Sequence, residues 1–420
     1  MVNRKAAIGF IFVTLLIDVM GWGLIIPVMP KLIAELKGIS VNEASPYGAW
    51  LISVYSLVQF VFAPLIGNLS DRYGRRPVLL FSLLGFGIDY LFLALAPNYG
   101  WLFVGRIIAG ITGASFTTAA AYIADVSTAE TRAKNFGLIG AAFGIGFIIG
   151  PALGGLLADF GTRAPFYAAA SLCLLNCLYG YFILPESLSK ENRRSFSWSR
   201  ANPIGSLLFL KKHRAVFGLS LSFFLIYLAA QAVQANWNFF TMDQFQWSEK
   251  MVGLSLGVVG LLVGAVQGGL TRVVNPRLGN EKSTYLGLFF YALGLIIMAF
   301  AGQTWVLFVS LIPYCLGGIA GPSLQSIMAG YVPPSQQGEL QGALTSLMSL
   351  TMIIGPGLMN NLYYHFAKPD APVHFPGIHF LLGGILMLGS IWVAWLVFRR
   401  KHPVPEQAAM PDELAAPVSH

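Results

Sequence analysis

Long apolar runs separated by short polar segments make up most of the chain. A helix that crosses the hydrocarbon core of a bilayer needs about 20 mostly apolar residues, and twelve runs reach that length. They lie roughly at residues 6–28, 49–69, 78–96, 101–122, 134–157, 165–184, 215–239, 251–270, 284–301, 305–327, 339–360 and 379–398. The pattern predicts an all-α membrane protein with twelve transmembrane helices.

The longest polar interruption divides these spans into two groups of six. Residues 185–214 are basic and mostly polar, so we predict a linker between an N-terminal bundle, residues 1–184, and a C-terminal bundle, residues 215–400. Residues 401–420 are polar and rich in proline and alanine. Because a segment of this kind has little apolar surface to bury, we predict a disordered tail.

The overall composition supports a membrane protein. Hydrophobic residues make up 56% of the chain and charged residues only 10%, whereas a soluble protein carries about 25% charged residues. Most of the surface must therefore face lipid. The net charge of +8 does not indicate a nucleic-acid partner, because the basic residues lie in the loops between apolar runs.

The distribution of basic residues predicts the orientation in the membrane. If the N-terminus is cytoplasmic, 20 of the 26 lysines and arginines lie in cytoplasmic segments, five lie in outer segments, and Arg106 lies within a span. Cytoplasmic loops of membrane proteins carry such an excess. We therefore expect a multi-pass protein of the bacterial inner membrane with the linker, the tail and both termini in the cytoplasm.

The two halves of the chain repeat each other. Short segments recur at an offset of 205 residues, or of 208 for the fourth and tenth spans. Ile148–Pro151 recurs as Ile353–Pro356, Arg72–Gly74 recurs as Arg277–Gly279, and Gly110–Gly113 recurs as Gly318–Gly321. Parallel six-helix repeats are typical of transporters whose two bundles rock about a site at their interface. The repeat predicts two pseudo-symmetric bundles.

Three charged residues lie deep within predicted spans. Asp18 and Asp89 are about 18 Å and 16 Å from the cytoplasmic helix ends, and Arg106 lies in the fourth span. An aspartate at such a depth costs about 2.5–3.5 kcal/mol on insertion scales and usually serves a function. Desolvation favours a neutral carboxyl and a nearby guanidinium favours a charged one. We predict that these residues couple transport to protons, the alternative being a static ion pair between helices.

The loop between the second and third spans has a distinctive sequence, Gly67–Pro77, with Gly74 at a tight turn. It resembles the signature loop of the major facilitator superfamily. The resemblance implies that Asp71, Arg72 and Arg75 act in an inner gate, with Asp125 at the cytoplasmic end of the fourth span as a partner. The alternative is that the loop only sets the topology.

Glycine and proline in the fifth span extend the resemblance. Small residues four apart let helix backbones approach closely, and this pattern is similar to a motif of the superfamily's antiporters, which implies export. We predict packing or hinge roles for these positions and their repeats. They are Gly146, Gly150, Pro151, Gly154, Gly355 and Pro356. Residues from Asp18 to Glu186 resemble the tetracycline/proton antiporters of the drug-export branch in particular.

The predicted cargo site combines amide and aromatic side chains. The first half supplies Tyr55 and Gln59, and the second half has no acid deep in a span. The candidates in the second half are Gln231, Gln234, Trp237, Gln267 and Tyr291. Such a wall suits a mostly apolar or amphiphilic molecule. Tetracycline pumps have an aspartate at the position of Tyr291, and some have a histidine at Val263, so tetracycline itself is less strongly implied.

Other functional classes lack support in the sequence. There is no nucleotide-binding loop, catalytic carboxylate pair or metalloprotease motif, so we do not expect an enzyme. The three cysteines and the histidines near the last loop have no metal-site spacing, and we expect neither metal nor cofactor. The sequence therefore predicts a monomeric proton-coupled antiporter exporting an amphiphilic drug or metabolite, with protons, cargo and lipid as its partners. A symporter or uniporter that imports a nutrient is the alternative.

Overall fold

The computed structural model describes residues 4–113, 115–127, 129–193, 195–196, 205, 210–212, 214–332 and 336–399. The predicted tail, residues 401–420, lies outside this part of the chain. Twelve described segments are long and apolar enough to cross a membrane, which confirms the predicted number of spans. All regular elements in the described residues are helices.

The N-terminal half contains six spans and one short helix, α2 (Met29–Lys37), between the first two. The spans are α1 (Arg4–Ile25), α3 (Val41–Tyr73), α4 (Arg75–Leu95), α5 (Tyr99–Thr112) continued by α6 (Ser115–Val126), α7 (Ala129–Leu157) and α8 (Ala164–Ile183). The turn between α3 and α4 is a single residue, Gly74, with φ 109°. Only glycine adopts such a backbone conformation readily.

The C-terminal half repeats this arrangement. Its spans are α10 (Arg214–Gln234) continued by α11 (Trp237–Gln244), α12 (Glu249–Ala265) continued by α13 (Thr271–Leu278), α14 (Asn280–Ala299), α15 (Thr304–Leu316) continued by α16 (Ala320–Gly330), α17 (Gln337–Ala367) and α18 (Ile378–Arg399). A π-helical turn, Val266–Leu270, joins α12 to α13. The turn between α13 and α14 is Gly279, with φ 77°, at the position that repeats Gly74.

Some helices extend beyond the predicted apolar runs. Helix α3 begins at Val41 rather than near residue 49, because Ser40 forms a capping box with Glu43: its hydroxyl accepts from the Glu43 N–H, and the Glu43 carboxylate accepts from the Ser40 N–H at 2.9 Å. Such reciprocal bonds satisfy N–H groups that a helix start leaves unpaired. Helix α17 likewise continues to Ala367 rather than ending near residue 360.

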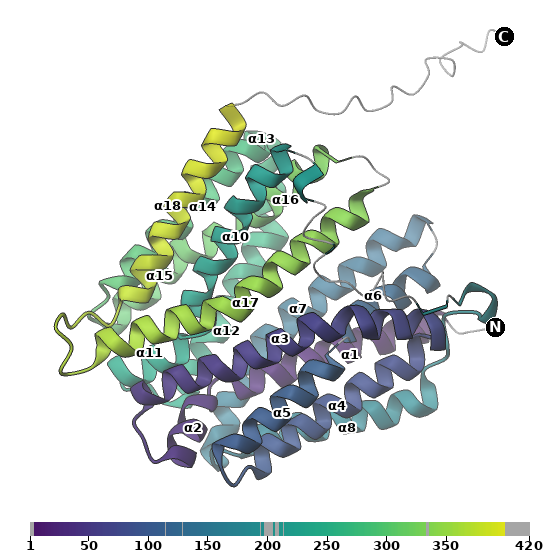
Figure 1. The fold of residues 1–420 in the computed structure, drawn as a ribbon, viewed down its shortest axis with the longest axis horizontal. Coiled ribbons are helices and arrows are strands. Elements are labelled where there is room, and N and C mark those ends of the chain that lie inside the picture. Colours follow the sequence, from purple (N-terminus) through teal and green to yellow (C-terminus); the bar gives the residue numbers. More distant parts are fainter. Residues whose placement is uncertain are drawn as a thin grey trace.

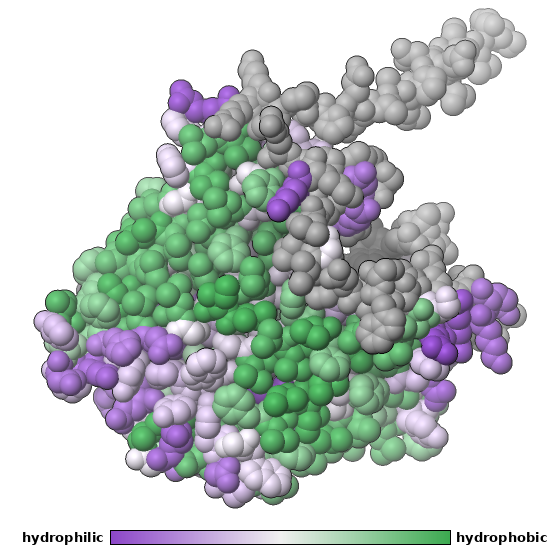
Figure 2. Space-filling view, in the orientation of Figure 1, coloured by the Kyte–Doolittle hydropathy of each residue, from purple (hydrophilic) through white to green (hydrophobic). Residues whose placement is uncertain are grey.

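The helices form two groups that meet along α7 with α12 and along α3 with α17 (Figure 1). We call the end where α1 begins and α18 ends the terminal end, and the end with α2 and α11 the closed end. Apolar side chains cover most of the visible face between the ends, and hydrophilic side chains gather towards the ends (Figure 2). This distribution suits a body surrounded by lipid.

Polar contacts join the two halves near the closed end. The Ser45 hydroxyl donates to Asn236 Oδ1 at 3.0 Å, and the Asn360 amide donates to the Ser45 carbonyl at 2.9 Å. The Asn238 amide donates to the Ile26 carbonyl at 2.8 Å. Two further contacts are a hydrogen bond from Ser53 to the Ile353 carbonyl, 2.8 Å, and an ion pair between Lys31 and Glu249, 2.7 Å.

The same halves separate toward the terminal end. Gly253, Gly257 and Gly260 lie on one face of α12, and a Cβ at any of them would contact α7. Gly264 is one turn further along the same face, yet a Cβ there would meet no atom within 4 Å. The two helices therefore touch at the closed end and diverge beyond Gly260. The two groups of helices likewise splay apart away from the closed end (Figure 1).

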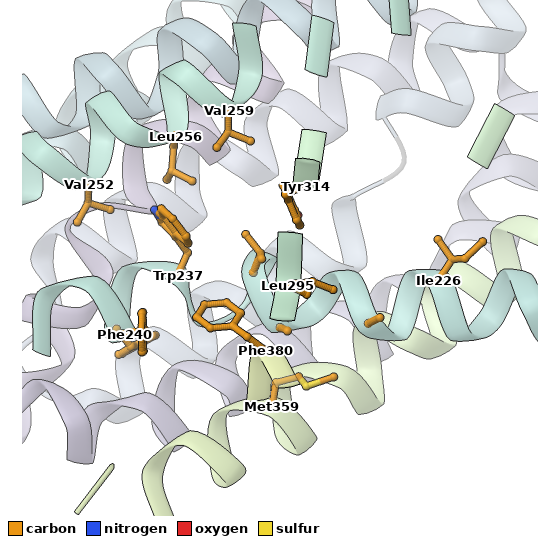
Figure 3. Packing of buried hydrophobic residues seen from close by; sticks show 14 of the residues in the cluster. Ile226, Trp237, Phe240, Val252, Leu256, Val259, Leu295, Tyr314, Met359 and Phe380 are labelled. Atoms are coloured by element: carbon orange, nitrogen blue, oxygen red, sulfur yellow. The ribbon is translucent and has the colours of Figure 1, made fainter. Parts of the chain in front are cut away.

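Trp237 lies within the core of the C-terminal half rather than on an accessible wall. Its side chain is 2% exposed and its indole N–H donates to the Ser255 hydroxyl at 2.9 Å. Phe380 packs beside it with the ring centroids 6.5 Å apart, and Val252 and Leu256 of α12 complete the surroundings (Figure 3). This geometry makes Trp237 a packing residue at the start of α11.

Candidate functional site

A buried ion pair joins α4 to α5. The Arg106 Nε donates to Asp89 Oδ1 at 3.2 Å, and a second guanidinium nitrogen pairs with the other carboxylate oxygen. Asp89 is 0% and Arg106 is 7% exposed. Gly105 permits the contact, because a Cβ there would lie 2.7 Å from Asp89 Oδ1. A two-pronged pair of this kind fixes both side chains.

Side chains of α3 adjoin this pair. The Arg106 guanidinium lies 5.8 Å from the ring centroid of Tyr55 and 5.9 Å from that of Tyr90. The Gln59 amide donates to the Tyr55 hydroxyl at 3.0 Å and to the Gly113 carbonyl at 2.8 Å. Aromatic faces attract a guanidinium, which favours the position of Tyr55 beside Arg106. Gln59 is hydrogen-bonded to Tyr55, so both residues belong to the same site as the charged pair.

Asp18 of α1 is a second buried carboxylate, and no ion pair joins it to a cation in the described part of the chain. It is 8% exposed, and among the described residues neither of its oxygens accepts a hydrogen bond, although the Ser115 hydroxyl of α6 lies near it. Both Asp18 and Asp89 interact electrostatically with Tyr90, which packs against α1 at Gly21. A buried carboxylate without a partner is costly, so packing alone does not explain Asp18.

The corresponding wall of the C-terminal half is neutral. The Gln231 and Gln234 amides are 3.4 Å apart, with Gln231 buried against Gly355 and Gln234 exposed. Gln267 is exposed on the π-helical turn, and Tyr291 contacts Tyr314. Among the described residues of this half, the buried ionisable side chains other than tyrosine and cysteine are Glu249 and His379, and both lie at the closed end.

The predicted gate residues meet at the terminal end. Arg75 contacts Asp71 at 2.6 Å and Asp125 at 3.2 Å, and it also donates to the Ser70 hydroxyl at 3.0 Å. These contacts connect α3, α4 and α6 within the N-terminal half. The Arg72 guanidinium instead lies over the ring of its neighbour Tyr73, 5.2 Å from the centroid.

Glu186, just after α8, is a member of this cluster that sequence reasoning missed. Its carboxylate accepts the backbone N–H groups of Arg75 at 2.8 Å and of Arg76 at 3.3 Å, at the start of α4. A carboxylate there satisfies unpaired N–H groups and the positive end of the helix dipole. An acid directly after Pro185, at the predicted cytoplasmic end of the sixth span and so on the same side of the membrane as the arginine-rich turn, was the available signal.

The glycine-proline segment of α7 lies between α1 and α12. A Cβ on Gly146 would be 2.8 Å from Val19, and one on Gly150 would be 3.0 Å from the Cα of Gly23, so these positions let α1 approach. Gly154 similarly faces Leu24. On the other side, Pro151 presents its carbonyl to Gly253 of α12. Pro151 and Pro356 both lie inside continuous helices.

Comparison with known proteins places this architecture in a family. The sequence profile of the Major Facilitator Superfamily matches residues 11–356 and 286–420. The chain belongs to the major facilitator superfamily. Both the predicted fold and the resemblance drawn from the loop and the fifth span are thereby confirmed, and the protein is a multi-pass membrane transporter.

Several superfamily members are similar over most of their length. The tetracycline resistance protein of class C from Escherichia coli is 41% identical over 89% of this chain and 93% of its own. The class G protein from Vibrio anguillarum is 41% identical over 86% and 91%. Multidrug resistance protein 2 from Bacillus subtilis is 30% identical over 95% and 97%.

Solved structures of the superfamily share the fold. A bacterial homolog of the human lysosomal transporter Spinster, inward-facing and unoccupied, gives a TM-score of 0.76 at 13% identity, covering 94% of this chain and 97% of that one. A D-xylose-proton symporter gives 0.73 at 17% identity, covering 94% and 98%. These identities support the fold alone.

Proposed function

We propose that the protein is a proton-coupled antiporter that exports an amphiphilic drug or metabolite across the bacterial inner membrane by alternating access. Tetracycline-like compounds are candidate cargoes, because the similar proteins include tetracycline and multidrug resistance proteins. The observation that carries the coupling is Asp18, a buried carboxylate that accepts no hydrogen bond from the described residues and lies beside the Asp89–Arg106 pair.

Mutual exclusion at Asp18 would supply the coupling. A buried carboxylate is stabilised by a proton, or by a positive or hydrogen-bond-donating group of a cargo. A proton bound to the carboxylate weakens the binding of cargo, and bound cargo weakens the binding of a proton to the same extent. Arg106 remains beside Asp89 and holds the site together. A proton taken up outside would therefore release cargo, and cargo taken up inside would release a proton.

The direction of access follows from the charge distribution. We assign the terminal end to the cytoplasm, because its loops carry most of the lysines and arginines. The halves then meet at the outer face and diverge toward the cytoplasm, which supports an inward-facing state. The opposite state requires the polar contacts of Ser45, Asn236 and Asn360 to separate.

Uptake into everted membrane vesicles tests the proposal, with tetracycline, chloramphenicol and ethidium as probes. Respiration acidifies the interior of such vesicles. Vesicles from expressing cells should accumulate at least one probe, and a protonophore should release it. Accumulation that ignores the pH gradient would instead support a uniporter. Accumulation only in right-side-out vesicles would support import, which the similarity to resistance proteins makes the weaker alternative.

Asp71→Asn tests the gate assignment in the same assay. We expect a several-fold loss of uptake with a near-normal protein level, because Arg75 loses one charged partner but keeps Asp125 and Ser70. Asp159→Asn, at an exposed aspartate near the closed end, is the matched control. Wild-type uptake by Asp71→Asn would mean that the loop sets topology and has no gating role.

A further inference from the structure

The repeat aligns one member of the ion pair of the first half, Arg106, with one member of a tyrosine contact in the second. At the offset of 208 that relates the fourth and tenth spans, Arg106 corresponds to Tyr314. At the offset of 205 that relates Gly74 to Gly279 before the third and ninth spans, Asp89 corresponds to Gly294. Tyr291 lies one turn from Gly294 on the same face of α14. The C-terminal half thus has Tyr314 at the position of the arginine, and Tyr291 one turn from the position of the aspartate.

Two glycines allow the tyrosines to pack closely against the opposite helix. A Cβ on Gly294 of α14 would lie 2.5 Å from the backbone nitrogen of Tyr314. A Cβ on Gly317, directly after α15, would lie 2.6 Å from the Cβ of Tyr291. Each tyrosine therefore rests on a glycine of the other span, and the rings meet edge to face with their centroids 4.8 Å apart. The contact is a built feature of this helix pair.

The two hydroxyls are incompletely hydrogen-bonded. Their oxygens are 3.4 Å apart, with Tyr291 as donor, whereas an ordinary O–H···O bond measures about 2.7–2.8 Å. Within the described part of the chain neither hydroxyl has another hydrogen-bond partner. Tyr314 is buried and Tyr291 is partly exposed. Because the 3.4 Å contact is long, the Tyr291 O–H can rotate away from Tyr314 and donate to a further oxygen, and its lone pairs can accept a hydrogen bond.

Neutral polar groups of neighbouring spans surround Tyr291. Tyr227 of α10 lies close enough to interact with it electrostatically, and Gln325 of α16 lies near Tyr227. Exposed Gln267 is 3.6 Å from the Cβ position of Gly318, the residue after the glycine on which Tyr291 rests. In the described part of the chain, the groups that act on Tyr291 are other tyrosines and a cysteine, which offer hydrogen bonds but no charge to compensate an ion.

We propose that Tyr291, positioned by Tyr314, determines specificity by hydrogen-bonding an uncharged oxygen of the cargo. The inference rests on the proposed function and assigns the two halves different tasks. The N-terminal half, with Asp18, recognises positive charge or a proton. The C-terminal half recognises a carbonyl or hydroxyl, because tyrosine hydroxyls both donate and accept. A site built to bond a hydroxyl or carbonyl discriminates strongly against an analogue that lacks it.

Equilibrium binding to the purified full-length protein tests this assignment. The probes are tetracycline, which carries several ring carbonyls and hydroxyls, and ethidium, an aromatic cation without oxygen. Tyr291→Phe should weaken tetracycline binding about tenfold and leave ethidium binding within about twofold. Tyr314→Phe should have a smaller effect of the same kind, because the Tyr291 hydroxyl remains. Tyr285→Phe, on the same helix but packed against Phe398, is the control and should change neither.

The outcomes separate this inference from the proposed function. Equal weakening of both probes by Tyr291→Phe, no change in either, or no binding of tetracycline to the wild type would each overturn the specificity assignment. A selective loss of tetracycline binding supports it even if vesicle uptake proves independent of the pH gradient. That last result would contradict proton antiport and leave the role of Tyr291 in place.

Discussion

Asp18→Asn should abolish accumulation of cargo against a pH gradient while cargo still exchanges across vesicle membranes at equal pH. Asparagine has the size of aspartate, but its side chain does not bind or release a proton at physiological pH. The variant should be as stable as the wild type, because the carboxylate it removes accepts no hydrogen bond among the described residues. Gradient-driven uptake and counterflow of a radiolabelled probe, measured on the same vesicles, separate the two activities.

Asp89→Asn serves as the contrasting variant. It leaves the buried Arg106 without its partner, and breaking a buried pair from one side costs about 3–5 kcal/mol. We therefore expect a lower melting temperature as well as lost accumulation, with the double variant Asp89→Asn/Arg106→Gln recovering stability but not coupling. If both single Asn variants concentrate cargo like the wild type, proton antiport through these carboxylates is wrong.

The sequence predicted the spans and the family, but not the full helix ends. Hydropathy detects only the part of a helix that lies in the hydrocarbon of the bilayer. The segment before the second span contains Asn42, Ser45 and Pro46, so its apolar pattern begins only after them. In the structure this polar segment is helical and holds the contact with the C-terminal half. The residues that join the two bundles here are polar, so the apolar run ends before them.

Charged positions in the site were predictable because charge within a span is costly and rare. Asp18, Asp89 and Arg106 were found in this way, and the structure places them around Tyr90. Neutral residues gave no such signal. An aromatic residue such as Trp237 can pack in a core or face a cargo, and only tertiary contacts distinguish the two. The roles of these residues in transport remain predictions.

The polar contacts at the closed end are suited to opening. Asn236 and Asn360 are fully buried, yet the Asn236 Nδ2 and the Asn360 Oδ1 have no partner among the described residues. Each unsatisfied atom costs about 1–3 kcal/mol, and water entering on separation would hydrate it. The closed end is therefore less stable than an apolar contact of the same size, so a modest difference in ligand affinity can shift the equilibrium.

A disulfide across this contact should stop transport almost completely. The change is Ser45→Cys with Asn236→Cys, in a background where Cys173, Cys177 and Cys315 are replaced by serine. The Ser45 Oγ and the Asn236 Oδ1 lie 3.0 Å apart, so the two side chains face each other across the contact, as a disulfide between these positions requires. Oxidation should reduce vesicle uptake to the level of non-expressing cells, and a reductant should restore it, because alternating access requires the halves to separate here.

A pair within one half provides the control. Ser222 of α10 and Ser390 of α18 have hydroxyls 2.6 Å apart, are buried like the first pair, and belong to the same bundle. Ser222→Cys with Ser390→Cys should therefore form a disulfide that leaves uptake nearly unchanged, since a bundle that moves as a rigid body tolerates an internal link. Undiminished uptake by the oxidised Ser45–Asn236 pair would show that the closed end does not separate during transport. Equal loss in both pairs would instead mean that motion within the C-terminal half drives the cycle.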